Sequence, residues 1–239
     1  MVARLLICLL LASSLPLSSC AALEQFGIGS GQGGGLTEER VAAGLREALT
    51  VGTSRAVERT GRTDGFLRNA LIKIVIPSEL TRMMNTLKDI GLTRQVNEFE
   101  VAMNRAAELA AAEAVDVFVE VVRGLTIQDA FSILNGHETA ATDLFRDRTT
   151  TTLASRFRPI VQRKMREVNL YNAYNYLAET YAALPFTPNT VFDVETYVVD
   201  RALNGLFTTL GQEEAKIRGN VRFRTTDLLR EVFGTLDRR

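Results

Sequence analysis

Arginines that lie beside hydroxyl and acidic residues form the constellation of this sequence that is best suited to chemistry. Arg146 and Arg158 belong to one stretch that also holds several threonines, and Arg224 and Asp227 flank a Thr-Thr pair. Hydroxyl groups and free backbone N–H groups at a helix start, together with nearby guanidinium groups, can hold a carboxylate or a phosphate. Helix caps and internal ion pairs use the same residue types. These four residues are therefore predicted to form either an anion site or an internal ion-pair cluster.

The usual catalytic and metal-binding motifs are missing from the sequence. His137 is the only histidine, which excludes an HExxH zinc site, and it follows Asn135-Gly136, as expected of a solvated turn residue. No GxSxG or P-loop string occurs. The sequence therefore predicts no catalytic residue, no metal site and no cofactor.

One enzymatic alternative needs only acidic residues and arginines. A pair of carboxylates can hydrolyse a glycosidic bond when the two groups lie about 5–9 Å apart. Glu213 and Glu214 are adjacent in a predicted helix, so their side chains point about 100° apart and make a poor pair. A deep pocket with two unpaired carboxylates would favour a hydrolase, and a shallow apolar groove would favour a non-catalytic binding protein.

The start of the chain has the anatomy of a signal peptide. Arg4 precedes an apolar stretch from Leu5 to Leu11, and small residues lead to Leu17-Ser18-Ser19-Cys20. This string resembles a bacterial lipobox, in which the cysteine is acylated and the leader is cut directly before it. We therefore expect residues 1–19 to be a signal peptide and Cys20 to be the lipid attachment site. An ordinary signal peptide cut near Ala22 is the alternative.

Acylation at Cys20 would hold the protein on a membrane, because two or more acyl chains anchor stably. Ala21 follows the cysteine where an aspartate would stand in a protein retained at the inner membrane, which by resemblance to Gram-negative lipoproteins favours the outer membrane, facing the periplasm. The other cysteine, Cys8, lies in the leader, so the mature chain cannot form an internal disulfide.

The overall charge excludes one class of partner. The chain carries 28 basic and 28 acidic residues, so no general basic field exists to attract nucleic acid. Residues 20–36 are rich in glycine and are predicted to form a flexible tether with a reach of roughly 20 Å. The expected partners are the membrane, through Cys20, and a protein or lipid of the envelope.

From residue 37 onward, apolar residues recur at helical spacing between capping and helix-stopping residues. Thr37, Ser78, Thr93 and Asp193 are predicted helix caps. The pattern predicts helices over about 37–60, 78–90, 93–124, 126–135, 139–167, 170–181, 193–219 and 225–233. Pro159 should start a new helix or kink the one that contains it. Residues 72–76 are β-branched and end at Pro77, and no second such run exists, so an extended buried connector is expected there.

The sequence therefore predicts an all-α protein, with one domain of eight or nine helices over residues 37–239. Several of its segments, in order, resemble the DUF4197 family, bacterial envelope proteins of unknown function. These are residues 44–49, 63–66, 72–74 with 76–77, 103–108, 141–146, 157–161 and 224–229. The resemblance implies a helical fold and an envelope location, and it brings no catalytic residues with it.

From the sequence we therefore expect a membrane-anchored periplasmic lipoprotein with a non-catalytic binding or structural role. A hydrolase that uses only carboxylates and arginines remains the alternative.

Overall fold

The computed structural model describes residues 36–238, apart from 129, 186 and 189–190. The predicted signal peptide, Cys20 and almost all of the predicted tether lie outside the described residues. The segment Leu36–Arg239 forms one compact unit with its own core. In its described part it consists of helices with no strand, so the all-α prediction is confirmed.

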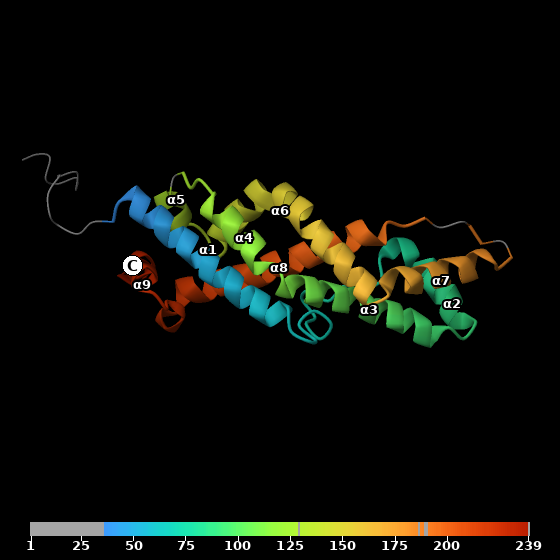
Figure 1. The fold of residues 1–239 in the computed structure, drawn as a ribbon. Coiled ribbons are helices and arrows are strands. Elements are labelled where there is room, and N and C mark those ends of the chain that lie inside the picture. The colour runs from blue at the N-terminus through green and yellow to red at the C-terminus, as the bar shows by residue number, and fades with distance from the viewer. Residues whose placement is uncertain (1–35, 129, 186, 189–190, 239) are drawn as a thin grey trace, which may run out of the picture. The chain divides into compact units, whose positions relative to one another are not determined.

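Nine α-helices make up this described part (Figure 1). They are α1 (Glu38–Thr60), α2 (Thr81–Asp89), α3 (Thr93–Ala112), α4 (Val115–Arg123), α5 (Ala130–Leu134), α6 (Ala140–Glu167), α7 (Leu170–Ala182), α8 (Val194–Gly219) and α9 (Asp227–Phe233). Short 3₁₀ helices occur at η2 (Ser78–Leu80), η3 (Val221–Phe223) and η4 (Leu236–Arg238).

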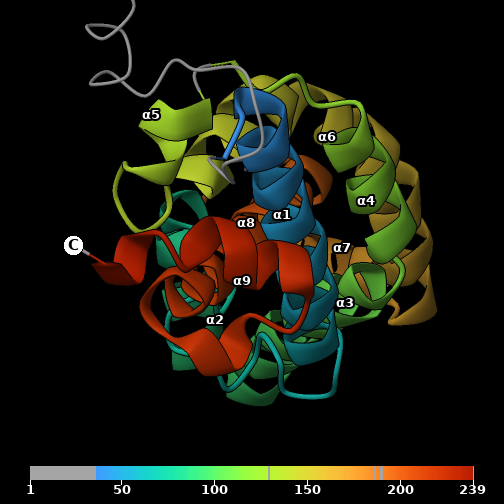
Figure 2. The same cartoon turned by 90° about the vertical axis from the view of Figure 1, so that its left-hand side faces the viewer.

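Helix α8 is the central element, because α1 and α6 both pack along it. Helix α3 packs on α6 and α7. Helix α9 packs on α1, as Figure 2 shows from the end of the domain. Phe118, Phe145 and Phe207 come from α4, α6 and α8 and meet with ring centroids 5.7–6.2 Å apart. Burial of such large apolar side chains drives these helices together.

Several predicted caps are present. The Thr37 side chain accepts the N–H of Arg40, and Asp193 accepts that of Thr196. Thr226 caps α9 by accepting the N–H of Leu229. Gly91 ends α2 with φ +94°, a conformation that glycine adopts without steric cost. The three capping side chains accept N–H groups that the first turn of a helix leaves without an acceptor. Gly91 instead supplies the left-handed turn that ends α2.

Two cap predictions were wrong. Ser78 is the first residue of η2 and its hydroxyl donates to Glu79, whereas Pro77 occupies the cap position. Thr93 is already the first residue of α3, after Leu92. Both predictions were displaced by one residue, because a short 3₁₀ turn or a tight helix-to-helix turn leaves no room for a separate side-chain cap.

The helix predicted over 93–124 is two helices, α3 and α4. The N–H groups of Glu113 and Ala114 bond to carbonyls three residues earlier, so the backbone turns there without glycine or proline. Ala114 stays buried, and the apolar period therefore continues across the break. At Pro159, by contrast, the helix is not interrupted. Pro159 lies inside α6 and does not start a new helix.

Candidate functional site

Arg224 serves the core of the domain. It is 2% exposed, and its Nε and Nη2 donate to the carbonyls of Ile217 and Arg218 at 2.8 and 2.7 Å, at the end of α8. It also forms an ion pair with Asp237. Hydrogen bonding and the charge of Arg224 hold the pKa of Asp237 below its ordinary value. The guanidinium group therefore caps α8 and ties the C-terminal segment to it.

Asp227 does not contact Arg224. Its carboxylate is fully exposed in the first turn of α9 and pairs with Arg230, one turn later on the same helix. Acidic groups at this position interact favourably with the helix dipole. Arg224 and Asp227 therefore do not form a joint site.

Arg158 lies at the centre of a polar network between α6, α7 and α8. Its Nη1 donates to Glu195 at 2.9 Å, and Gln162 and Tyr171 donate to the same carboxylate at 2.8 and 3.0 Å. Burial acts to raise the pKa of Glu195, but these three hydrogen bonds outweigh it and lower that pKa overall. Burial and the neighbouring Glu195 raise the pKa of Tyr171 to about 12. The network is satisfied internally and joins three helices.

Arg146 differs from the other three predicted residues. Its guanidinium carbon lies 5.2 Å from the centroid of the Phe207 ring, which supports it by a cation–π contact. Its Nε is buried and has no hydrogen-bond partner. Among the described residues, no carboxylate pairs with it. A buried N–H donor without an acceptor costs about 1–3 kcal/mol, so a ligand that supplies an acceptor here would bind favourably.

A cavity of about 330 Å³ lies beside this guanidinium group, between α6 and α8. Its polar lining includes Glu138, Thr139, Asp143, Arg146 and Gln212, and Phe207 contributes an aromatic wall. Asp143 accepts a hydrogen bond from the Thr139 hydroxyl at 2.8 Å. The arrangement offers a fixed cation together with carboxylate and amide groups. It suits a small polar ligand with an anionic end and hydrogen-bond donors.

The structure thus does not bring the four predicted residues together. No hydrogen bond or ion pair joins any two of them within the described part of the chain. Arg146 and Arg158 are twelve residues apart on α6, which corresponds to about 18 Å along the helix axis. Three of the four have internal partners, and Arg146 alone lines a cavity without an ion-pair or hydrogen-bond partner.

Glu213 and Glu214 contact different partners, as their adjacent positions on α8 require. Glu213 accepts from Arg59 and Lys216, at 2.5 and 2.6 Å. Glu214 accepts the N–H groups of Ala141 and Thr142 at the start of α6, at 3.0 and 2.7 Å, and also pairs with Arg218. A buried carboxylate there neutralises the free N–H groups of the helix start. Neither glutamate is available as part of a catalytic pair.

A polar cluster on α3 was not predicted from the sequence. The side chain of Asn104 bonds to both backbone groups of Ile74, and Glu108 accepts the N–H groups of Phe66 and Leu67. Arg105 joins Glu108 to Asp64. Three of the segments that carry the family resemblance therefore meet in one place. The sequence feature that could have revealed this cluster is the polar pair Asn104-Arg105 inside an otherwise apolar helical stripe.

A shallow groove of about 800 Å³ runs along α3. Its lining is mostly apolar and includes Val101, Ala102 and Val168, together with the exposed charged residues Arg94 and Glu98. This is the kind of hollow that favours a binding protein over an enzyme. The described residues contain no cluster of metal-ligand side chains, and none of the described helices has the length and apolar character needed to cross a bilayer.

Comparison with known proteins gives one result. The sequence model of the family described as "Protein of unknown function (DUF4197)" matches residues 35–234. No curated protein and no solved structure gives a significant match. Because this match spans the whole helical domain except its last residues, the chain belongs to the DUF4197 family.

Proposed function

We propose that this protein is a lipid-anchored lipoprotein of the bacterial envelope whose helical domain binds a small ligand and does not catalyse a reaction. The observation that carries the binding role is Arg146. Its guanidinium group is held over Phe207, has a buried Nε without an acceptor, and lines a cavity. The charged residues that are buried, Glu108, Glu213, Glu214, Arg218 and Arg224, are paired with one another, with other charged residues or with backbone groups.

The anchoring part of the proposal rests on Leu17-Ser18-Ser19-Cys20 and the apolar run before it. Its location is the outer membrane, facing the periplasm. Cys20→Ala should move the protein from the membrane to the soluble fraction. Cys8→Ala changes the other cysteine and should leave the protein on the membrane. An intact mass without acyl chains on the wild-type protein would refute the anchor.

The binding part can be tested at the Arg146 Nε–H, which gives its own NMR signal. Titration with acetate, glycine and inorganic phosphate should shift this signal for the ligand that fits the cavity. Arg146→Ala should abolish binding, whereas Arg148→Ala, which removes an exposed arginine on the same helix, should not. Equal binding by the wild-type and Arg146→Ala proteins would exclude this cavity as the site.

The hydrolase alternative would need two carboxylates near one another. Glu138 and Asp143 line the same cavity as Arg146 and are the pair it would have to use. Turnover of a bound ligand, followed by mass spectrometry and lost in both Glu138→Gln and Asp143→Asn, would favour the enzyme. Binding without turnover supports our proposal.

A further inference from the structure

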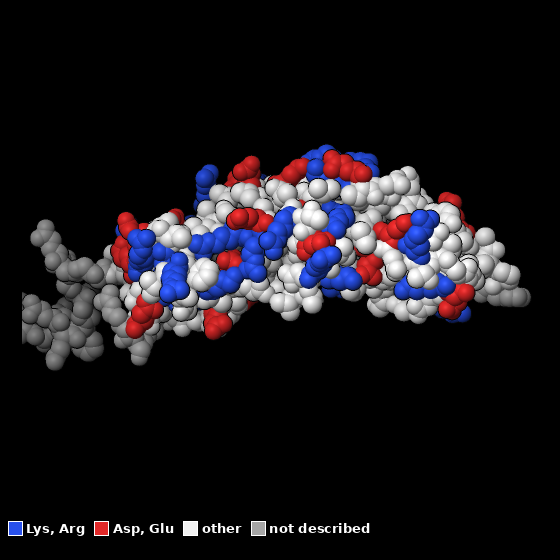
Figure 3. Space-filling model, turned by 90° about the horizontal axis from the view of Figure 1, so that it is seen from below, with Lys and Arg blue, Asp and Glu red and all other residues white. Residues whose placement is uncertain are grey.

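Basic side chains gather where the C-terminal half of α1 meets the end of α8 and η3. We call Arg55, Arg59, Arg62, Arg68, Lys216 and Arg222 the basic face. In Figure 3 the Lys and Arg side chains form a band over this half of the domain, in which they predominate over interspersed acidic side chains. The chain as a whole has no net charge, so this band reflects a segregation of charge.

Shared partners connect five of the six members of the basic face. Arg55 and Lys216 lie 5.8 and 5.7 Å from the centroid of the Phe223 ring. Arg59 and Lys216 share the Glu213 carboxylate. Arg59 also lines a polar hollow of about 600 Å³ together with Arg62 and Arg68. These five cations therefore lie close to one another, and Arg222 adjoins Phe223 in the chain.

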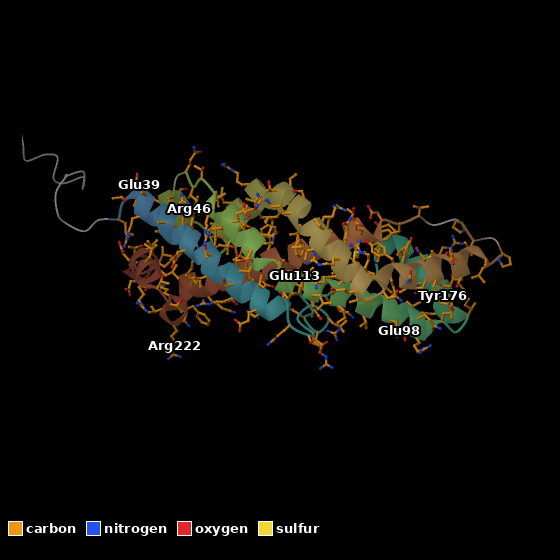
Figure 4. The ribbon with its side chains drawn as sticks, in the orientation of Figure 1. Glu39, Arg46, Glu98, Glu113, Tyr176 and Arg222 are labelled. Atoms are coloured by element: carbon orange, nitrogen blue, oxygen red, sulfur yellow. The ribbon has the colours of Figure 1, made fainter. Side chains whose placement is uncertain are left out.

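The local carboxylates do not balance these cations. Asp64 and Glu213 are already paired, and Glu58 lies one turn before Arg62 on α1. Six cations thus face three carboxylates. The Nη1 atom of Arg55 is buried without a hydrogen-bond partner. Arg62 and Arg222 are exposed and form no ion pair with the described residues, and Figure 4 shows Arg222 pointing away from the helices.

Arginine binds phosphate oxygens through two parallel N–H groups and is less strongly hydrated than lysine. Five of the six cations are arginines, spread over a surface and not gathered in a closed pocket. This layout matches an array of phosphates better than a single bound ion. Exposed Val221, next to Arg222, adds an apolar contact of the kind found at a lipid interface.

We propose that the basic face binds the surface of a bilayer that contains anionic phospholipids. Each exposed cation near such a surface adds to the attraction, which weakens as salt shortens the Debye length. The inference rests on the proposed lipid anchor, which would hold the domain beside a membrane. The face would then set which side of the domain lies against the lipid.

The test uses residues 36–239, the compact unit that contains the whole described core, so that no acyl chain contributes. The protein is floated with vesicles of phosphatidylglycerol and phosphatidylethanolamine, and separately with vesicles of phosphatidylcholine alone. We expect binding to the anionic vesicles only, and its loss between about 0.1 M and about 0.5 M NaCl.

The double variant Arg62→Glu, Arg222→Glu should reduce binding to anionic vesicles by about tenfold or more. Neither side chain has an internal partner, so the fold should persist, and Arg62→Gln, Arg222→Gln gives a milder version. The control is Arg123→Glu, Arg148→Glu, two exposed arginines on α4 and α6, which should bind as the wild type does.

Three results would overturn the inference: equal binding to neutral vesicles, unchanged binding by the double variant, or loss of vesicle binding in a few millimolar inorganic phosphate at constant ionic strength, which would indicate a site for free phosphate. These outcomes are separate from failure of the anchor, which is read from the acylation of Cys20 in the full chain.

Discussion

The side-chain amide of Asn104 pairs with the backbone of Ile74 as a neighbouring strand would. Asn104 Oδ1 accepts the Ile74 N–H at 2.9 Å, and its Nδ2 donates to the Ile74 carbonyl at 2.8 Å. Nδ2 also donates to the Glu100 carbonyl at 2.9 Å, so all three bonds are made inside the core. Within residues 72–76, Ile72 and Ile74 are buried, whereas Lys73 and Val75 are exposed, so the predicted buried connector is buried on one side only. The pairing with Asn104 explains how the backbone of Ile74 stays in the core although no strand of the described residues lies beside it.

Replacing Asn104 by leucine should therefore leave the N–H and the carbonyl of Ile74 buried without a hydrogen-bond partner. We expect the free energy of unfolding to fall by about 3 kcal/mol, because each unsatisfied buried group costs about 1–3 kcal/mol. Urea denaturation measures this loss. Asn97→Leu, at an exposed position on the same helix, should change stability by less than about 0.5 kcal/mol. Equal effects of the two substitutions would contradict the role assigned to Asn104.

Arg224 and Arg146 should respond differently to replacement by alanine. Arg224→Ala removes donors from two buried carbonyls and from Asp237, so stability should fall by about 2–3 kcal/mol. Arg146→Ala removes a cation–π contact but also an unsatisfied donor, so its cost should stay below about 1 kcal/mol. Thermal and urea unfolding of both variants test the difference, and a larger loss for Arg146→Ala would refute this assignment.

The Glu195 network should make stability depend on pH in acid. The pKa of Glu195 is below its ordinary value of 4.5 in the folded protein, so between the folded and unfolded values the unfolded state binds more protons. Stability from this group is therefore present above about pH 5 and is lost as the pH falls through the folded pKa. In Glu195→Gln, the free energy of unfolding measured by urea denaturation should fall less steeply between pH 6 and about pH 3. An unchanged slope would mean that other carboxylates carry the acid sensitivity.

Much of the fold followed from local sequence patterns. Caps such as Thr37 and Asp193, and the stop at Gly91, could be identified because each meets a backbone requirement at one position. The break between α3 and α4 could not, because the hydrogen bonds at Glu113 and Ala114 change without any change in residue type or apolar period.

The candidate site was harder to predict than the fold. Arg146 and Arg224 both stand near threonines in the sequence, but tertiary contacts decide which guanidinium finds an acceptor. Asp237, which pairs with Arg224, lies thirteen residues away, and Phe207, which supports Arg146, lies on another helix. Local patterns identified the residue types, whereas the packing of α8 against α6 and α9 determined their roles.

The contact of Phe66 with Gly205 gives a steric test of how the connector after α1 docks on α8. A β-carbon at Gly205 would lie 2.9 Å from Cζ of Phe66, closer still to Cε1, and 3.3 Å from Cβ of Ile72. Phe66 is fully buried, so its ring cannot move aside without disturbing the core. Gly205→Ala should therefore lower the free energy of unfolding by about 2 kcal/mol, although alanine favours a helix. Gly219→Ala, on the same helix with nothing within 4 Å of the added carbon, should be neutral or stabilise by up to about 1 kcal/mol. If Gly205→Ala were as stable as Gly219→Ala in urea denaturation, Phe66 could not be packed against α8 as described.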